Sequence, residues 1–125
     1  MDVAPTPVHL APKQAGAVGL ILNELATNSV KHAPRPGERI RLSLSTSQGD
    51  GEVCLEYRDN GLGYPEDVLQ GKREGMGLYL IEALAEHDLA GKIALANDHG
   101  AVTRLRFALS FDVQSDDPPS MATLP

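Results

Sequence analysis

Residues 23–33 read "NELATNSVKHA" and end a segment whose apolar residues recur at helical spacing. This spacing predicts an amphipathic helix from Lys13 to about His32. Pro12 stands just before the first turn, and Pro34 and Pro36 follow the last one, so both ends carry boundary signals. The positions that set the period are Ala15, Val18, Ile21, Leu22, Leu25, Ala26 and Ser29–Val30.

On such a helix Glu24, Asn28 and Lys31 form one row at i, i+4 and i+7, and His32 borders it. The row offers a carboxylate, an amide oxygen and a cation. Hard oxygens suit Mg²⁺, which takes few protein ligands beside phosphate oxygens, and the two cations would lie near the phosphate charge. Taken alone, the row favours an ordinary solvated helix face.

Other segments alternate apolar and polar residues and predict strands around a second helix. The expected strands are "PVHL" (7–10, an edge strand), "RIRLSLS" (39–45), "EVCLEYR" (52–58), "GKIALAN" (91–97) and "VTRLRFALSF" (102–111), with "MGLYLIEALAEHDLA" (76–90) as the helix. The order is strand, helix, two strands, helix, two strands. One-faced strands and amphipathic helices in this order predict an α+β two-layer sandwich, a sheet covered on one side by helices.

The stretch "RDNGLGYP" (58–65) follows one of these strands directly. Asp59 at the strand end could accept a hydrogen bond from an exocyclic amine such as that of adenine, a contact worth roughly 1.5–3 kcal/mol. Gly61 and Gly63 would permit positive φ and let a flat ligand approach the backbone. A tight turn explains the same residues equally well.

The stretch "EGMGLYLIEAL" (74–84) places Gly75 and Gly77 before a helix start, where free N–H groups favour an anion. A glycine loop that caps a helix explains it as well. No P-loop motif occurs in the chain, because "QGKREGMG" has the wrong order and spacing.

The 125 residues suffice for one compact domain, which we expect over residues 1–113, before a loose tail at 114–125. No run approaches the roughly 18 apolar residues of a membrane span. A net charge of −6 argues against a general nucleic-acid binder. The N-terminus lacks a secretory signal and the single Cys54 cannot form an internal disulfide, so we expect a cytoplasmic location.

Together, the helix row, the Asp-x-Gly-x-Gly turn and the Gly-x-Gly-Leu helix start resemble the GHKL ATPase superfamily, from about Val8 to Phe111. "NELATNSVKHA" looks like its N box, "DNGLG" like its first glycine box and "GMGL" like its second. The N box, the "YP" and the short lid from Glu66 to Glu74 look most like catalytic domains of bacterial sensor histidine kinases. They resemble a branch related to the HWE kinases, but Asn23 replaces that subgroup's histidine and the chain has no tryptophan.

The resemblance implies a Bergerat-type fold, a mixed sheet with helices on one face, and the cofactors ATP and Mg²⁺. By similarity, Asn28 would coordinate Mg²⁺, and Glu24 would act near it through water or as a base. Lys31 and His32 would face the phosphates or the ribose side.

By the same similarity, Asp59 would bind the adenine amine. The ATP-binding residues would further include Gly61 and Gly63 at the adenine floor, Gly75, Gly77 and Leu78 over the phosphates, and Thr103, which would bind adenine through water. On its own, Thr103 is better explained as a β-branched strand residue.

The implied reaction is transfer of the ATP γ-phosphoryl group to a histidine on a helical dimerisation domain, upstream of a response regulator. None of the four histidines lies in an acceptor motif, so we expect the catalytic part of a larger kinase, monomeric when isolated. Three alternatives remain: a stand-alone anti-sigma-type serine kinase, a nucleotide-binding pseudokinase module and a structural domain with fortuitous glycine turns. The intact Glu24, Asn28 and Asp59 count against the pseudokinase.

Overall fold

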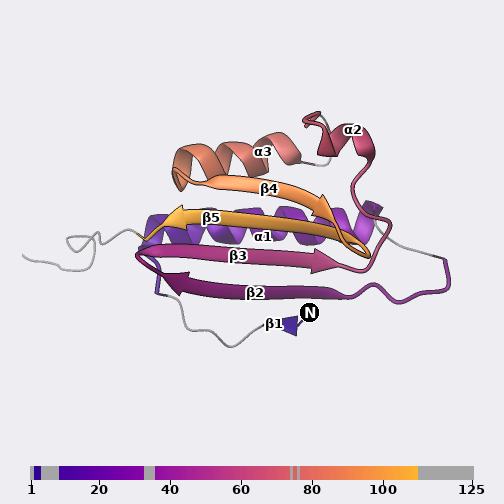
Figure 1. Cartoon of the computed structure of the whole chain (residues 1–125), viewed down its shortest axis with the longest axis horizontal. Coiled ribbons are helices and arrows are strands. Elements are labelled where there is room, and N and C mark those ends of the chain that lie inside the picture. The colour runs from indigo at the N-terminus through magenta and orange to yellow at the C-terminus, as the bar shows by residue number, and fades with distance from the viewer. Residues whose placement is uncertain (1, 4–8, 33–35, 74, 76, 110–125) are drawn as a thin grey trace, which may run out of the picture.

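The structure is a computed structural model that describes residues 2–3, 9–32, 36–73, 75 and 77–109. Its elements in chain order are β1 (Asp2–Val3), α1 (Pro12–His32), β2 (Leu42–Gly49), β3 (Glu52–Asp59), α2 (Glu66–Leu69), α3 (Leu78–Ala83), the π-helical turn η1 (Leu84–Asp88), β4 (Lys92–Asn97) and β5 (Ala101–Ala108). The strands form one sheet in the order β1-β2-β3-β5-β4, with β1 parallel to β2 and the remaining pairs antiparallel. Figure 1 shows α1 and α3 against this sheet. The predicted two-layer sandwich is confirmed.

Helix α1 buries one face against the sheet. Its buried side chains fall at helical spacing and include Ala17, Ile21 and Leu25, each at most 3% exposed. Gly16 and Gly19 lie on the exposed side, where they weaken intrinsic helix propensity, so packing of the buried face has to stabilise the helix. Ala15 and Val30, which help to set the sequence period, are exposed instead.

The helix-facing side of the sheet supplies the other half of the core. In β3 every second residue is buried, from Val53 to Asp59, and β5 matches it with Leu105 and Phe107. Leu78 of α3 closes the core and is 1% exposed. Since the strand period is two, this alternation fixes which β3 residues face α1, and the last of them is Asp59.

Four segments differ from the sequence prediction. β2 is Leu42–Gly49 instead of residues 39–45, because its pairing with β3 continues to Gly49 and Glu52. The edge strand is β1 at Asp2–Val3: His9 and Leu10 are not in a strand, and residues 7–8 lie outside the described part, as does the tail 114–125. α2 lies in the stretch from Glu66 to Glu74, which the sequence predicts as a short lid without a helix. The helix begins after Pro65. Glu66 and Asp67 lie in its first turn, where acidic groups suit the helix dipole. The second helix ends in the π-helical η1.

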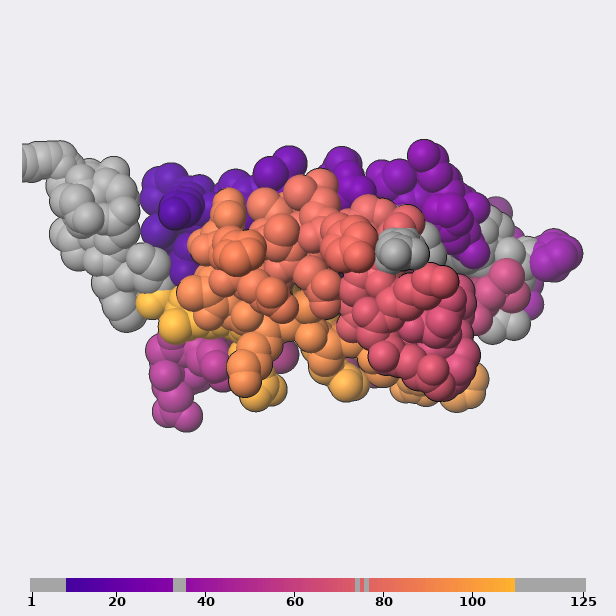
Figure 2. Space-filling model, turned by 90° about the horizontal axis from the view of Figure 1, so that it is seen from above, coloured from indigo at the N-terminus to yellow at the C-terminus, as the bar shows by residue number. Residues whose placement is uncertain are grey.

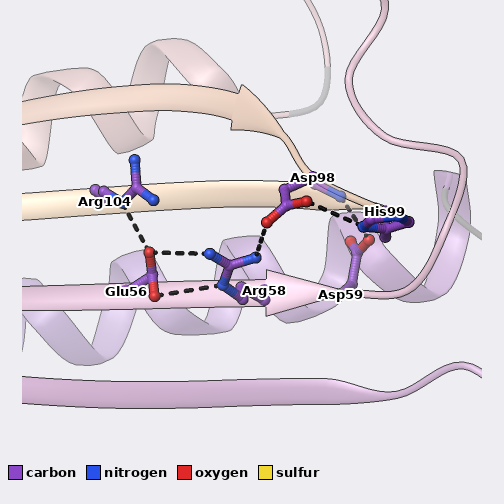
Figure 3. A network of polar contacts seen from close by, with 7 residues as sticks. Glu56, Arg58, Asp59, Asp98, His99 and Arg104 are labelled. Carbon is purple, nitrogen blue, oxygen red and sulfur yellow. Dashed lines mark hydrogen bonds and ion pairs between the residues drawn. The ribbon is translucent and has the colours of Figure 1, made fainter.

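The opposite face of the sheet carries a charged network instead of helices (Figure 3). Glu56 accepts from Arg104 at 2.7 Å and pairs with Arg58 at 3.3 Å, and Arg58 reaches Asp98 at 3.0 Å. The Arg104 hydrogen bond holds the pKa of the Glu56 carboxyl below its usual range, and Arg58 does the same to the pKa of Asp98. The network ties β3 to β5 and to the β4–β5 turn.

Figure 2 shows α1 along one side of the molecule, α3 and η1 beside it, and the α2 segment at one end. None of the described helices combines the length and apolar character that a membrane crossing requires.

Candidate functional site

A pocket opens where the last turns of α1 meet the end of β3 and the start of β5. Its empty volume is about 270 Å³, a figure that includes solvent at its open mouth. It is lined by Leu25, Asn28, Ser29, His32, Asp59, Gly63, Tyr64 and Ala101. Of the predicted α1 site residues, Asn28 and His32 line this pocket together with Asp59, whereas Glu24 and Lys31 do not.

Asp59 is the charged group at the floor of this pocket and is 8% exposed. Its Oδ1 accepts the backbone N–H groups of Gly61 at 2.9 Å and Ala101 at 3.0 Å, and its Oδ2 accepts the Ser29 hydroxyl at 2.8 Å. These bonds compensate for burial of the carboxylate and set its orientation. Burial with this partner set goes beyond what a turn requires, which favours a binding role.

Gly63 has the positive φ that the sequence predicts, and Gly61 does not. Gly63 has a positive φ of 87°, and a Cβ on it would lie 2.8 Å from the side chain of Asn97, so only glycine fits there. Gly61 has no positive φ, so that part of the prediction was wrong, while approach of a flat ligand to its backbone stays a prediction. Its N–H instead orients Asp59.

Asn97, at the end of β4, holds the loop after β3 in place by two hydrogen bonds to the backbone of Tyr64. Its Oδ1 accepts the Tyr64 N–H at 2.7 Å, and its Nδ2 donates to the Tyr64 carbonyl at 3.0 Å. The sequence prediction missed this residue. An asparagine directly before the Asp-His-Gly turn was the available signal, because asparagine side chains commonly bond to nearby backbone groups.

Thr103 lies in β5 and is 2% exposed. Its Oγ1 is 2.6 Å from the Tyr64 hydroxyl, and burial raises the pKa of that phenol, which therefore stays neutral. Of these two residues, Tyr64 lines the pocket and Thr103 does not. A water-mediated contact from Thr103 to adenine stays a prediction.

The predicted row on α1 does not behave as one solvated face. Asn28 is 7% exposed and lines the pocket, and its side-chain Nδ2 is buried with no hydrogen-bond partner among the described residues. Glu24 is half-buried against Gly77, where a Cβ would overlap Glu24 Oε1. Lys31 is exposed. An unpaired buried amide nitrogen is uncommon, which makes Asn28 a candidate ligand contact.

The second glycine motif starts α3, as predicted. Gly77 is the N-cap residue with φ 65°, and Gly75 has φ 78°. Leu78 points into the core, and its N–H donates to the Gly75 carbonyl at 3.2 Å. Contacts of these three residues with phosphates stay predictions. His32, in contrast, lines the same pocket as Asp59.

Within the described ranges, no three His, Cys, Asp or Glu side chains gather as a metal cluster. A magnesium ion bound chiefly by nucleotide oxygens and water needs only one or two protein oxygens. Asn28 can supply such an oxygen. Its Nδ2 has no partner among the described residues, and a half-turn of the amide group would put the oxygen in the place of that nitrogen.

Residues 14–113 match the family described as histidine kinase-, DNA gyrase B- and HSP90-like ATPase. The chain belongs to this family. It is an ATP-binding catalytic domain of the kind found in sensor histidine kinases. The pocket around Asp59 lies inside the matched region of this ATPase domain.

The relatives of the ATPase domain are histidine kinases. A blue-light-activated histidine kinase from Erythrobacter litoralis is 32% identical over 77 residues, 62% of this chain and 21% of the relative. A signal transduction histidine-protein kinase from Streptomyces coelicolor is 33% identical over 117 residues, 81% of this chain and 20% of the relative. The chain therefore spans about a fifth of the length of these curated relatives.

Solved structures show the same fold. The histidine kinase domain of a blue-light activated histidine kinase from Erythrobacter litoralis superposes with a TM-score of 0.74 at 24% identity, over 91% of this chain and 52% of that one. The ATP binding domain of PrrB from Mycobacterium tuberculosis gives 0.66 at 27% identity, over 88% of this chain and 81% of that one.

Proposed function

We propose that this ATPase domain transfers the γ-phosphoryl group of Mg·ATP to a histidine on a separate dimerisation domain. The observation that carries the proposal is the pocket lined by a buried Asp59 and by a buried Asn28 whose Nδ2 has no partner in the described part of the chain. In this proposal Asp59 accepts a hydrogen bond from the adenine amine, and the flat base lies near Gly63 and Tyr64.

The metal would be held by Asn28, with Glu24 close to it. Glu24 contacts the start of α3, so it links the metal region to the second glycine motif. A bound Mg²⁺ would neutralise charge on the phosphate oxygens during transfer. Lys31 is exposed near the end of α1 and would add positive charge on the side where the phosphates leave the pocket.

The chemistry needs little covalent help from the protein. The bond between the γ-phosphorus and the β–γ bridging oxygen breaks, ADP leaves, and a new P–N bond forms on an imidazole nitrogen of the acceptor. Positioning of ATP by Asp59 and Asn28 accounts for most of the contribution we assign to this chain. Glu24 would accept the imidazole proton directly or through water.

The wider biology is proposed from the same assignment. The acceptor domain would lie on another segment or another protein, a response regulator would receive the phosphoryl group, and the isolated domain (residues 1–113) would be a monomer. We place it in the cytoplasm, because its free Cys54 suits a reducing compartment.

A phosphotransfer assay tests the proposal. The chain is incubated with γ-labelled ATP, Mg²⁺ and a histidine-bearing dimerisation domain, with the same acceptor carrying a His→Gln change as control. We expect label on the acceptor that is lost in acid, because phosphohistidine is acid-labile and phosphoserine is not. Acid-stable label on a partner would support the anti-sigma-type serine kinase instead. ATP binding without any transfer would support the pseudokinase module.

A further inference from the structure

A chain of three buried polar side chains connects α1 to β3 beneath the pocket. The Tyr57 hydroxyl is 2.9 Å from Ser29 Oγ, and Ser29 Oγ donates to Asp59 Oδ2 at 2.8 Å. Ser29 is 2% exposed and Tyr57 3%. The sequence places Ser29 in the helical period and Tyr57 in a predicted strand, and neither has a functional role in the proposal above.

The direction of the hydrogen bonds in this chain follows from the number of protons. A hydroxyl has one proton, and an ionised carboxylate only accepts. Since Ser29 gives its proton to Asp59, it must accept from Tyr57. Burial raises the pKa of the Tyr57 phenol, so it keeps the proton that it donates.

Counted over the described residues, the same argument leaves one acceptor position open on Asp59. A carboxylate has about four acceptor sites. Gly61 and Ala101 fill two on Oδ1, and Ser29 fills one on Oδ2. The remaining position on Oδ2 can receive one more donor. Ser29 also lines the pocket, but its proton is committed and cannot turn toward a ligand carbonyl.

We propose that Ser29 and Tyr57 are positioning residues that make Asp59 select a purine with a hydrogen-bond donor at position 6. A carbonyl at that position would face acceptors only, and a bare C–H would leave the open Oδ2 position unpaired. This inference rests on the proposed contact between Asp59 and the purine. It adds that the selectivity depends on the hydroxyl of Ser29 and, behind it, that of Tyr57.

The test measures two affinities by calorimetry with Mg²⁺ present, for ATP and for purine riboside triphosphate, which lacks only the 6-amine. For the unaltered chain we expect ATP to bind about tenfold more tightly, a difference of about 1.4 kcal/mol. In Ser29→Ala we expect ATP to bind about three- to tenfold more weakly while the analogue changes less than about twofold, as the loss of one hydrogen bond predicts. The preference for ATP should therefore shrink.

Two further variants complete the design. Tyr57→Phe keeps the ring and removes the hydroxyl, so it should also reduce the preference for ATP, but by less than Ser29→Ala does. It replaces Ser29→Ala in the test if that variant does not fold. Ser45→Ala makes the same chemical change at an exposed position of β2 and should leave the preference intact.

The outcomes separate the two claims. Equal weakening of both nucleotides by Ser29→Ala and Tyr57→Phe would show a structural role only and overturn the inference. An unchanged preference in both variants would overturn it too, while Asp59 would keep its role. If the unaltered chain binds both nucleotides equally, the purine contact of Asp59 itself is wrong, and the inference falls with it.

Discussion

Gly77 lies so close to Glu24 that a methyl group on residue 77 would overlap the Glu24 carboxylate. The contact joins two motifs that lie far apart in sequence, the first long helix and the start of α3. It also couples the backbone that begins α3 to a side chain that we place beside the metal.

We expect Gly77→Ala to reduce phosphotransfer at least about tenfold, because the new methyl displaces Glu24, while an alanine at positive φ costs about 1–2 kcal/mol of stability. Gly51→Ala in the β2–β3 turn is the matched control: its φ is 74°, and no described neighbour lies within 4 Å of its Cβ position. It should lose similar stability and much less activity. Equal losses of activity in the two variants would remove the role of the Glu24 contact.

Asn28→Ala should abolish Mg²⁺-dependent phosphotransfer without destabilising the nucleotide-free fold. A buried amide without a partner costs about 1–3 kcal/mol, so its removal should leave the free energy of unfolding equal or higher. Urea unfolding without nucleotide, beside an activity assay, measures both effects. Asn23→Ala, at an exposed position of α1, should change neither. Full activity in Asn28→Ala would contradict the metal assignment.

Asp59→Asn should weaken ATP binding by about tenfold or more, roughly 1.4 kcal/mol. The two backbone N–H groups would keep the amide oxygen on their side. The amide nitrogen would then present a donor to the adenine amine, which is also a donor. Calorimetry on a folded variant measures the change, and Asp98→Asn on the outer face supplies the same chemical change as control. Unchanged affinity in Asp59→Asn would remove the adenine contact.

Ala90→Gly should raise the free energy of unfolding by about 1 kcal/mol. Ala90 follows η1 with φ 51°, a left-handed conformation that costs an alanine about that much and costs glycine little. Ala83→Gly, at a helical φ of −62°, should destabilise by about 1 kcal/mol. Thermal unfolding of both variants checks the opposite signs. A lower melting temperature for Ala90→Gly would contradict the account of this helix end.

The charged face should make stability depend on acid pH through Glu56. Because its pKa is lowered in the folded state, chiefly by Arg104, its contribution is present above the ordinary glutamate pKa and is lost as pH falls through the folded value. At neutral pH, the free energy of unfolding of the unaltered chain should exceed that of Glu56→Gln by a few tenths to about 1 kcal/mol. The difference should shrink below about pH 4.3.

Urea unfolding over a pH series measures this difference. Glu52→Gln is the control on the same strand, with a longer 3.7 Å pair to Arg106 and a smaller expected effect. A Glu56→Gln difference that stays constant down to about pH 3 would contradict the role of the ion pairs.

The sequence predicted the parts of the fold that follow from local periodicity. α1 and β3 appear where the pattern placed them, because their apolar residues meet a core at a regular period. β2 is Leu42–Gly49 instead of residues 39–45, because antiparallel pairing with β3 continues to the Gly49–Glu52 pair. β1 was misplaced, since a two-residue strand is defined by parallel pairing of Asp2 with Ser43 and leaves no periodic signal. α2 was missed because four residues are too few to show a period.

The site residues likewise divide into those with a local sequence signal and those without one. Asp59 was a candidate because a carboxylate stands at a strand end before two glycines, but a tight turn explained the same residues equally well until its burial and partners were known. Ser29 was part of the helical period and Tyr57 part of a strand, since a small hydroxyl and an aromatic residue both occur in cores without function. Their partnership is a contact between α1 and β3 that no local pattern encodes.

The central claim is that Asp59 holds the purine end of a nucleotide whose metal is held by Asn28. The most direct test is a crystal structure of the chain with Mg²⁺ and a non-hydrolysable ATP analogue. We expect the 6-amine of adenine at about 3 Å from Asp59 Oδ2. A base bound outside the pocket, with no contact to that carboxylate, would contradict the account.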